Sequence, residues 1–290
     1  MGDMKPELEC GLCVLEWVYG RATAQNGNRD IPQLFRKILH LLSAEITGAS
    51  NLGSLCNQAV SLIYEFVTPE SDFWQELKGK TNAFVLGLLP AADDYIEKGE
   101  TPRDRFERAC FLASAGNVAP IGVPSGAFTF PDVLGIMEGK TALPAVSGDP
   151  FGAAQKARNV FYVTDNAGEI GFDSLLVKTL KKMGLRVTLV VKEPAFFEDA
   201  TMEDAAFFGL DRVADEVVTV NKIFVQGKDQ TRANQAFRES DLLLVKGTGS
   251  YESLKDETFG KRAIYLLKIK CNPLARHTGT GKGGLVVRAA

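Results

Sequence analysis

The sequence predicts an α/β fold: a sandwich built on a mainly parallel sheet, preceded by an all-α N-terminal subdomain. Two patterns predict it. The first 115 residues carry apolar side chains at helical spacing, and from residue 159 onward short apolar strands alternate with helices. Strands that are apolar along their whole length are typical of parallel sheets covered on both faces. The 290 residues leave room for one large domain or two smaller ones.

The helical region is expected to span residues 1–115. Asp30 is a suitable N-cap for a helix whose apolar stripe follows over residues 31–42. Thr101-Pro102 combines a cap with a first-turn proline, so a helix is expected from there to Ala115. Two further helices are predicted over residues 55–66 and 83–96, the second interrupted at Pro90.

A connecting region, residues 116–158, is rich in glycine and proline and holds one predicted short helix near residues 133–138. The α/β core follows over residues 159–290. Its predicted strands are 160–164, 186–191, 216–220, 242–245, 263–268 and, near the end, 285–287. Its predicted helices are 172–183, 202–208, 231–238 and 251–259.

The composition excludes several classes of partner. The chain carries 33 Lys and Arg against 36 Asp and Glu, a net charge of −3. A protein that binds the nucleic-acid backbone usually has a basic surplus, so we expect no nucleic-acid partner. The longest uncharged run, residues 109–131, is interrupted by prolines and glycines, which argues against a spanning helix and a membrane partner. Five cysteines in a chain of this length do not suggest a disulfide scaffold, and we expect a cytoplasmic protein.

Ligands of open parallel sheets lie beyond the carboxyl ends of the strands, so the residues just after each strand are the first site candidates. Asp165-Asn166-Ala167-Gly168-Glu169 follows the first strand of the core. Glu198-Asp199 lies a few residues beyond the second strand, and Lys246-Gly247-Thr248-Gly249-Ser250 follows the fourth. Two acidic clusters and a Lys-Gly-x-Gly turn are therefore expected at one edge of the sheet.

These residue types indicate metal-assisted phosphate chemistry. Asp165, Asn166 and Asp199 offer oxygen ligands, which hard divalent ions such as Mg²⁺ or Mn²⁺ prefer. Lys246 and the amides of the glycine-rich turn are suited to holding a phosphate group. A metal ion that polarises a phosphoryl oxygen would suit phosphoester hydrolysis.

Each of these motifs also has a purely structural interpretation. Asn166 with Glu169, and Thr201 with Asp204, are both suitable capping pairs for the helices that come after them. The two glycines of the Lys-Gly-x-Gly turn would also serve a tight turn without any ligand. Their shared position at one sheet edge favours a functional site.

Three other sequence features are weaker candidates for a functional site. Cys10-x-x-Cys13 lies on an expected helix, and without a second cysteine pair we interpret it as helix packing rather than a zinc site. Gly279-x-Gly281-x-x-Gly284 matches a dinucleotide-binding pattern but precedes a strand rather than a helix, so we interpret it as a loop. The two histidines, His40 and His277, and the absence of a Gly-x-Ser-x-Gly elbow predict no catalytic triad.

A series of motifs along nearly the whole chain resembles the DUF89 family. In order, they are Cys10-x-x-Cys13, Gly116-Asn117, Asp165-Asn166-Ala167-Gly168-Glu169, Glu198-Asp199-Ala200-Thr201 with Asp204, Lys246-Gly247-x-Gly249-x-Tyr251-Glu252-x-Leu254 and Lys270-Cys271. The Asp-Asn-Ala-Gly-Glu and Lys-Gly-x-Gly segments are specific in combination. The Cys-x-x-Cys start and the compact size are similar to the archaeal and bacterial branch of that family.

The resemblance implies a Rossmann-like α/β/α core and a metal-dependent phosphatase that clears damaged or unwanted phosphometabolites. By position, Asp165, Asn166 and Asp199 resemble the ligands of the divalent metal, which would be Mg, Mn, Co or Ni. Lys246 resembles the phosphate-binding lysine. The pocket residues implied in the same way are Asn117, Glu169, Gly247, Gly249 and Ser250.

Two positions depart from the family's pattern. Pro120 stands where the family often has an aspartate three residues after Gly-Asn, and Ser250 stands where it often has an asparagine. Both positions are expected near the substrate, so they are expected to bear on which substrate is accepted.

The resulting prediction is a hydrolase of small phosphomonoester metabolites, with Asp165, Asn166 and Lys246 as catalytic residues. The expected nucleophile is a water molecule bound by the metal. A covalent nucleophile at Asp165 is an open alternative, although the Asp-x-Asp spacing typical of such phosphatases is absent because Ala167 occupies the third position. Two other functions also stay open. One is an S-adenosylmethionine- or nucleotide-binding enzyme on the same core, and the other is a non-catalytic protein that binds a phosphometabolite or a metal.

Overall fold

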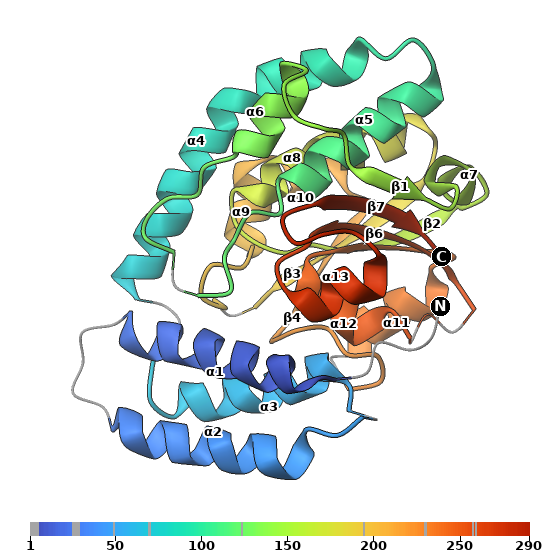
Figure 1. The fold of residues 1–290 in the computed structure, drawn as a ribbon. Coiled ribbons are helices and arrows are strands. Elements are labelled where there is room, and N and C mark those ends of the chain that lie inside the picture. Colours follow the sequence, from blue (N-terminus) through green and yellow to red (C-terminus); the bar gives the residue numbers. More distant parts are fainter. Residues whose placement is uncertain are drawn as a thin grey trace.

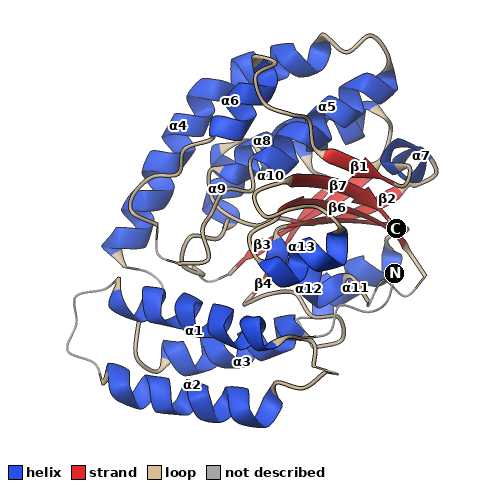
Figure 2. Ribbon diagram, in the orientation of Figure 1, coloured by secondary structure: helices blue, strands red, loops and turns tan. Residues whose placement is uncertain are grey.

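The computed structural model describes residues 6–24, 30–48, 50–68, 71–122, 124–193, 195–228, 231–256, 258 and 260–290. Within these residues the chain forms one seven-stranded sheet flanked by helices (Figures 1 and 2). The strands are β1 (Ala145–Ser147), β2 (Asn159–Val163), β3 (Arg186–Lys192), β4 (Glu216–Val220), β5 (Leu242–Lys246), β6 (Arg262–Lys268) and β7 (Leu285–Ala289). The helices are α1 (Leu8–Thr23), α2 (Ile31–Glu45), α3 (Leu52–Tyr64), α4 (Asp72–Glu97), α5 (Pro102–Ala115), α6 (Pro131–Met137), α7 (Pro150–Gln155), α8 (Glu169–Lys182), α9 (Met202–Phe207), α10 (Leu210–Val213), α11 (Thr231–Glu239), α12 (Thr248–Leu254) and α13 (Asn272–Thr278).

The sheet is mainly parallel, which confirms the predicted fold class. Its strand order is β1-β7-β6-β5-β2-β3-β4, and β6 and β7 form the one antiparallel pair among the described strands. At the centre, Tyr162 of β2 is in register with Leu189 of β3 and Leu244 of β5. The carboxyl ends of β2, β3, β5 and β6 therefore meet at the same edge of the sheet.

Each face of the sheet has its own apolar core because successive strand residues point to opposite faces. Val160 and Tyr162 of β2 join the core beneath α4, α5 and α8. Phe161 and Val163 join the core beneath α11, α12 and α13. The β2 side chains that enter the two cores are buried, so β2 is covered on both sides, as its continuous apolar sequence predicts.

Helices α1–α3 form a further layer, drawn in blue at the bottom of Figure 1. Their core includes Val18, Ile38 and Ile63, together with Trp74 at the start of α4 and Phe197 from the loop after β3. This layer is thus packed onto a loop of the α/β core. The domain division at residues 115 and 158 stays a prediction; in the structure α4 and α5 pack against α8, and β1 adds to the sheet.

The helix signals in the sequence have mixed outcomes. Asp30 caps α2 by accepting a hydrogen bond from the Gln33 amide at 2.9 Å, and Thr101 caps α5 with a reciprocal bond to Asp104. The predicted interruption at Pro90 is wrong, because α4 runs through it from Asp72 to Glu97. Pro90 is exposed, and the buried residues on both sides of it hold the helix on the core despite the missing backbone N–H.

Several short elements escaped the sequence patterns. They are α7, α10, α13 and β1, each too short to show a period. The predicted helix over residues 251–259 is α12, which begins at Thr248 and ends at Leu254, and its expected end at Phe259 lies outside the described residues. None of the described helices combines the length and the apolar composition that crossing a membrane requires.

Candidate functional site

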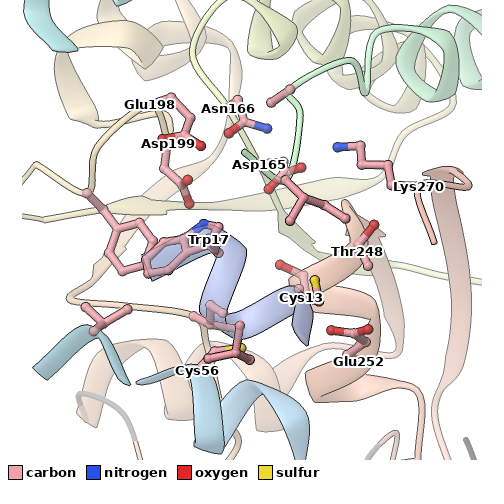
Figure 3. A pocket seen from close by; sticks show the side chains of 18 of the residues that line it. Cys13, Trp17, Cys56, Asp165, Asn166, Glu198, Asp199, Thr248, Glu252 and Lys270 are labelled. Carbon is pink, nitrogen blue, oxygen red and sulfur yellow. The ribbon is translucent and has the colours of Figure 1, made fainter. Parts of the chain in front are cut away.

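A cavity of about 160 Å³ lies between the carboxyl ends of the strands and helices α1 and α3 (Figure 3). One wall comes from the segments just after β2, β3, β5 and β6, and the other from the helical layer. Asp165, Asn166 and Asp199 all line it. The sheet edge that the sequence singles out is therefore the wall of a real cavity, large enough for a small molecule.

Backbone hydrogen bonds join the loop after β2 to the loop after β3, and these two loops carry the three residues. Asn166 and Asp199 form an isolated antiparallel bridge. The Ala200 amide donates to the Asp165 carbonyl at 2.9 Å, and the Ala167 amide donates to the Glu198 carbonyl at 2.9 Å. The three predicted metal ligands thus come from one double-loop platform, and their relative positions are fixed by the main chain.

Phe197, in the loop before Asp199, has a left-handed backbone with φ +54°, which is strained for a non-glycine residue. Its ring is buried and makes edge contacts with Trp17 and Trp74, each at a centroid distance of 5.5 Å. This aromatic anchor holds the strained turn and directs the next two residues, Glu198 and Asp199, into the cavity.

Arg21 links the helical layer to the same loop. Its side chain is buried, pairs with Glu198, and donates to the Ile121 carbonyl at 3.0 Å. The guanidinium also lies over the Trp17 ring, 4.2 Å from its centroid. Burial lowers the pKa of Arg21 and the neighbouring Glu198 opposes that change. The pair therefore fixes the loop beside Asp199 from the α1 side.

The carboxylate of Asp199 is electrostatically costly in the absence of a cation. Burial raises its pKa well above the usual value, and the nearby Asp165 adds to the rise. Lys192 opposes it, with Nζ 3.4 Å from Asp199 Oδ2. Asp165 and Asp199 therefore repel each other across the cavity, and Lys192 offsets this repulsion only in part. A bound cation would remove the rest of the repulsion.

Asn117 and Glu169 lie behind the cavity wall rather than in it. The Asn117 amide donates to Asp165 Oδ2 at 2.6 Å and to Glu169 Oε2 at 3.0 Å. Glu169 also accepts from the amides of Ala119 and Asn166, at 3.0 and 3.1 Å. Through these hydrogen bonds, Asn117 and Glu169 orient the side chains of Asp165 and Asn166. The capping interpretation of Asn166 is not borne out, since the N-cap of α8 is Gly168, whereas Thr201 and Asp204 do form a capping box.

Lys246 is fully buried and directed toward α8. Its Nζ lies 2.8 Å from Asp173 Oδ1 and 3.1 Å from the Glu169 carbonyl. Tyr162 donates to the same Asp173 oxygen at 2.7 Å. Lys246 is not among the residues that line the cavity. Its role as the phosphate-binding lysine stays a prediction, and its observed contacts are those of a buried ion pair beneath the site.

The glycine-rich turn brings α12 close to Asp165. Gly247 has φ +85°, and a Cβ there would lie 2.2 Å from Asp165 Oδ2, so only glycine fits. Gly249 and Ser250 line the cavity. Pro120, the other position that departs from the family's pattern, lines it as well. Both departures therefore lie on the cavity wall.

Several residues that line the cavity were not predicted as site residues. Lys270 and Lys192 supply its amines, and Lys270 extends toward Asp165 in Figure 3. Both lysines follow or end strands, β6 and β3, so the rule that led to Asp165 would also have found them. Trp17 and Glu252 also line the cavity, and only the tertiary packing of α1 and α12 reveals that.

The donor set suits a hard divalent cation. Asp165 and Asp199 carboxylates with the Asn166 amide oxygen are ligands that Mg²⁺ and Mn²⁺ accept. Within the described residues, no three His, Cys, Asp or Glu side chains gather closely enough to hold a metal without such an amide. The five cysteines are free, and burial raises the pKa of Cys13 to about 12, so its thiol is neutral near pH 7.

Comparison with known proteins gives a consistent answer. The model of the damage-control phosphatase ARMT1-like domain matches residues 8–286. A damage-control phosphatase of Archaeoglobus fulgidus is 30% identical over 98% of this chain and 99% of its own. A damage-control phosphatase of Pyrococcus horikoshii is 32% identical over 98% and 97%. The crystal structure of a DUF89 family protein from Pyrococcus horikoshii is similar with a TM-score of 0.73 at 25% identity, covering 98% of both chains.

Proposed function

Because the chain belongs to the ARMT1-like damage-control phosphatase family, we propose that it hydrolyses a small phosphomonoester with a divalent metal held by Asp165, Asn166 and Asp199. One observation carries the proposal. The hydrogen-bonded loops after β2 and β3 direct the carboxylates of Asp165 and Asp199 and the amide of Asn166 into one cavity. Lys192 and Lys270 line the same cavity. A cation site beside amines is suited to binding a phosphate ester and neutralising its charge.

The metal, when bound, would act as a Lewis acid that withdraws charge from a phosphoryl oxygen. The chain's own residues have separate tasks. Lys270 and Lys192 would bind the phosphate oxygens and offset the negative charge that gathers on them during transfer. Asn117, held by Glu169, would keep the Asp165 carboxylate oriented. The apolar wall from α1 and α3 would limit the access of bulk water to the reacting group.

The oxygen-only ligand set favours Mg²⁺ or Mn²⁺ over Co²⁺ or Ni²⁺. The substrate class we propose is a phosphorylated small metabolite, because the cavity is too small for a polymer. The cytoplasmic location expected from the composition stays a prediction. Asp165 as a covalent nucleophile also stays an alternative, and trapping of an aspartyl-phosphate would favour it.

The first experiment measures phosphate release from p-nitrophenyl phosphate with Mg²⁺, Mn²⁺, Co²⁺ or Ni²⁺, and with a chelator. We expect activity that the chelator abolishes. Replacing Asp165 by alanine should lower kcat by about 10³-fold, because a metal ligand that faces the reacting group is lost. A matched control is Asp211→Ala, which removes an exposed carboxylate on α10 and should leave the activity unchanged.

The opposing outcomes are specific. Equal activity of the Asp165→Ala variant, or no hydrolysis with any metal, would overturn the proposal. Tight binding of a phosphate ester without turnover would favour a non-catalytic binding protein. Calorimetric titration with S-adenosylmethionine and NAD tests the nucleotide-binding alternative.

A further inference from the structure

The cavity has a second end whose chemistry phosphate binding does not explain. Figure 3 shows Glu252 and Cys13 on one side of the cavity, away from Asn166 and Asp199. The rest of the lining is mainly apolar and comes from the helical layer and the loop after β3. Its apolar members include Val14, Trp17, Val60, Phe196 and Ile223.

Glu252 is an uncompensated carboxylate. It lies on α12, is partly buried, and makes no hydrogen bond or ion pair with any side chain in the described part of the chain. The basic residue that acts on its charge is Lys255, whose Nζ is paired with Asp256 instead. A carboxylate without a donor in a cavity is available to a ligand.

The surroundings of Glu252 are neutral thiols. Its charge acts on Cys10, Cys13, Cys56 and Cys271 and helps to raise the pKa of each. Burial is the main cause, and it raises the pKa of Cys271 to about 11. These side chains are therefore small uncharged groups, and none of them supplies a cation to Glu252.

The wall that carries Glu252 is held rigidly against α3. A Cβ on Gly53 of α3 would lie 2.5 Å from the Cβ of Ser253 on α12. The backbone of α3 therefore lies directly against the Ser253 side chain. The Asn51 amide donates to the Ser253 carbonyl at 2.9 Å, and Asn57 exchanges two hydrogen bonds with the Ile223 backbone, at 2.8 and 3.0 Å. These contacts fix α12, the helix that carries Glu252, against α3.

We propose that Glu252 selects the substrate by binding a hydrogen-bond-donating group, a hydroxyl or an ammonium, at the end of the substrate opposite the phosphate. The substrate is then a phosphomonoester with an apolar middle, which suits the mainly apolar lining of the cavity, and a donor at its far end. The inference rests on the proposed function, since it takes the phosphate to lie beside Asp165 and Lys270.

The same carboxylate excludes a class of substrates. A phosphoester whose far end carries a carboxylate or a second phosphate would bring like charges together in an enclosed space. A substrate without any polar group there would leave Glu252 without a partner while removing it from water. Glu252 therefore acts in two ways: it attracts donors and rejects anions.

The test, run at pH 8 where Glu252 is mostly ionised, uses linear alkyl phosphates of three to six carbons that differ only in the far group: methyl, hydroxyl, ammonium or carboxylate. At the best chain length, we expect kcat/KM for the hydroxyl or ammonium ester to exceed that of the methyl ester by about 10-fold. The carboxylate ester should be poorer than the hydroxyl ester by about 100-fold. In E252Q, which keeps the shape but loses the charge, the gap between hydroxyl and carboxylate esters should shrink to less than about 10-fold.

The ratio between esters is the readout, so a change in the amount of folded enzyme cancels. Glu100→Gln, at an exposed position between α4 and α5, removes the same charge far from the cavity and should keep the wild-type ratio. Hydrolysis of p-nitrophenyl phosphate by the wild type, with no preference among the four far groups, overturns the inference and leaves the proposed function standing. No hydrolysis of any ester overturns both.

Discussion

The two walls of the cavity differ in origin and in chemistry. The sheet-side wall comes from segments at strand ends, and it presents Asp165, Asn166 and Asp199 with two lysines. The helix-side wall comes from α1 and α3, and it presents thiols and aromatic rings such as Cys13 and Trp17. The first wall is fixed by main-chain hydrogen bonds, the second by side-chain packing. The proposed metal and phosphate sites therefore lie on the sheet side, as does Glu252 of α12, and the helical layer closes the cavity with an apolar surface.

The largest expected effect distinguishes the roles of Lys246, at the end of β5, and Lys270, just after β6. Lys246→Met leaves Asp173 buried without its cation, so the free energy of unfolding should fall by about 3–5 kcal/mol. Lys270→Met, at the cavity wall, should keep the melting temperature and lower kcat/KM for p-nitrophenyl phosphate by about 10²-fold. Denaturant unfolding and steady-state kinetics on both variants check this contrast. If Lys246→Met folds normally and loses only activity, Lys246 is the phosphate-binding lysine.

A smaller effect concerns the contact between the two walls. Arg21→Lys keeps the charge but loses the forked geometry that binds Glu198 and the Ile121 carbonyl. The loop beside Asp199 should loosen, and the metal concentration for half-maximal activity should rise about 10-fold. Arg212→Lys, at an exposed arginine of α10, is the matched control. An unchanged metal requirement would show that the helical layer does not support the metal site.

The smallest effect is a pH dependence of stability. Burial raises the pKa of Glu252 to about 7, so the folded protein holds this proton more tightly than the unfolded chain. Glu252 therefore favours folding at low pH, and this contribution is lost as the pH rises from about 4.5 through 7. Lys255 opposes the rise of this pKa. The other titratable groups on which the charge of Glu252 acts have raised pKa values and stay neutral over that range; they are the thiols of Cys10, Cys13, Cys56 and Cys271 and the Tyr251 phenol.

E252Q should accordingly be more stable than the wild type at pH 8 and equal to it near pH 5. Melting curves at both pH values measure the difference, which corresponds to about 2–4 °C for each kcal/mol in a chain of this size. The Glu100→Gln control should show no such pH-dependent gap. A constant difference at both pH values would mean that the charge of Glu252 carries no cost in the fold.

The sheet-side wall is largely predictable from the sequence because strand ends are local features. Asp165, Asn166 and Asp199 lie in segments that come shortly after apolar strands, and the main chain brings these segments together. Lys270 obeys the same rule at the end of β6 but is not among the predicted site residues. Which lysine faces the cavity depends on where β5 and β6 direct their ends, and a sequence pattern does not contain that information.

The helix-side wall could not be predicted for a related reason. Arg21 and Trp17 lie on α1, and their periodicity shows only that a helix buries one face. Arg21 is separated from its partner Glu198 by 177 positions in the sequence, so their pairing arises from tertiary packing alone. The expectation for Pro90 is wrong for the opposite reason, because a local rule is outweighed by the packing of α4 on the core.

The space above Gly247 has a practical consequence for engineering this enzyme. The Asp165 carboxylate occupies the volume where a side chain at position 247 would be. A mutant library that randomises the cavity wall should therefore leave position 247 untouched, since even a methyl group there would push the carboxylate away. Ser250 and Pro120 border the same cavity and are not glycines, so diversity is better introduced at these two positions.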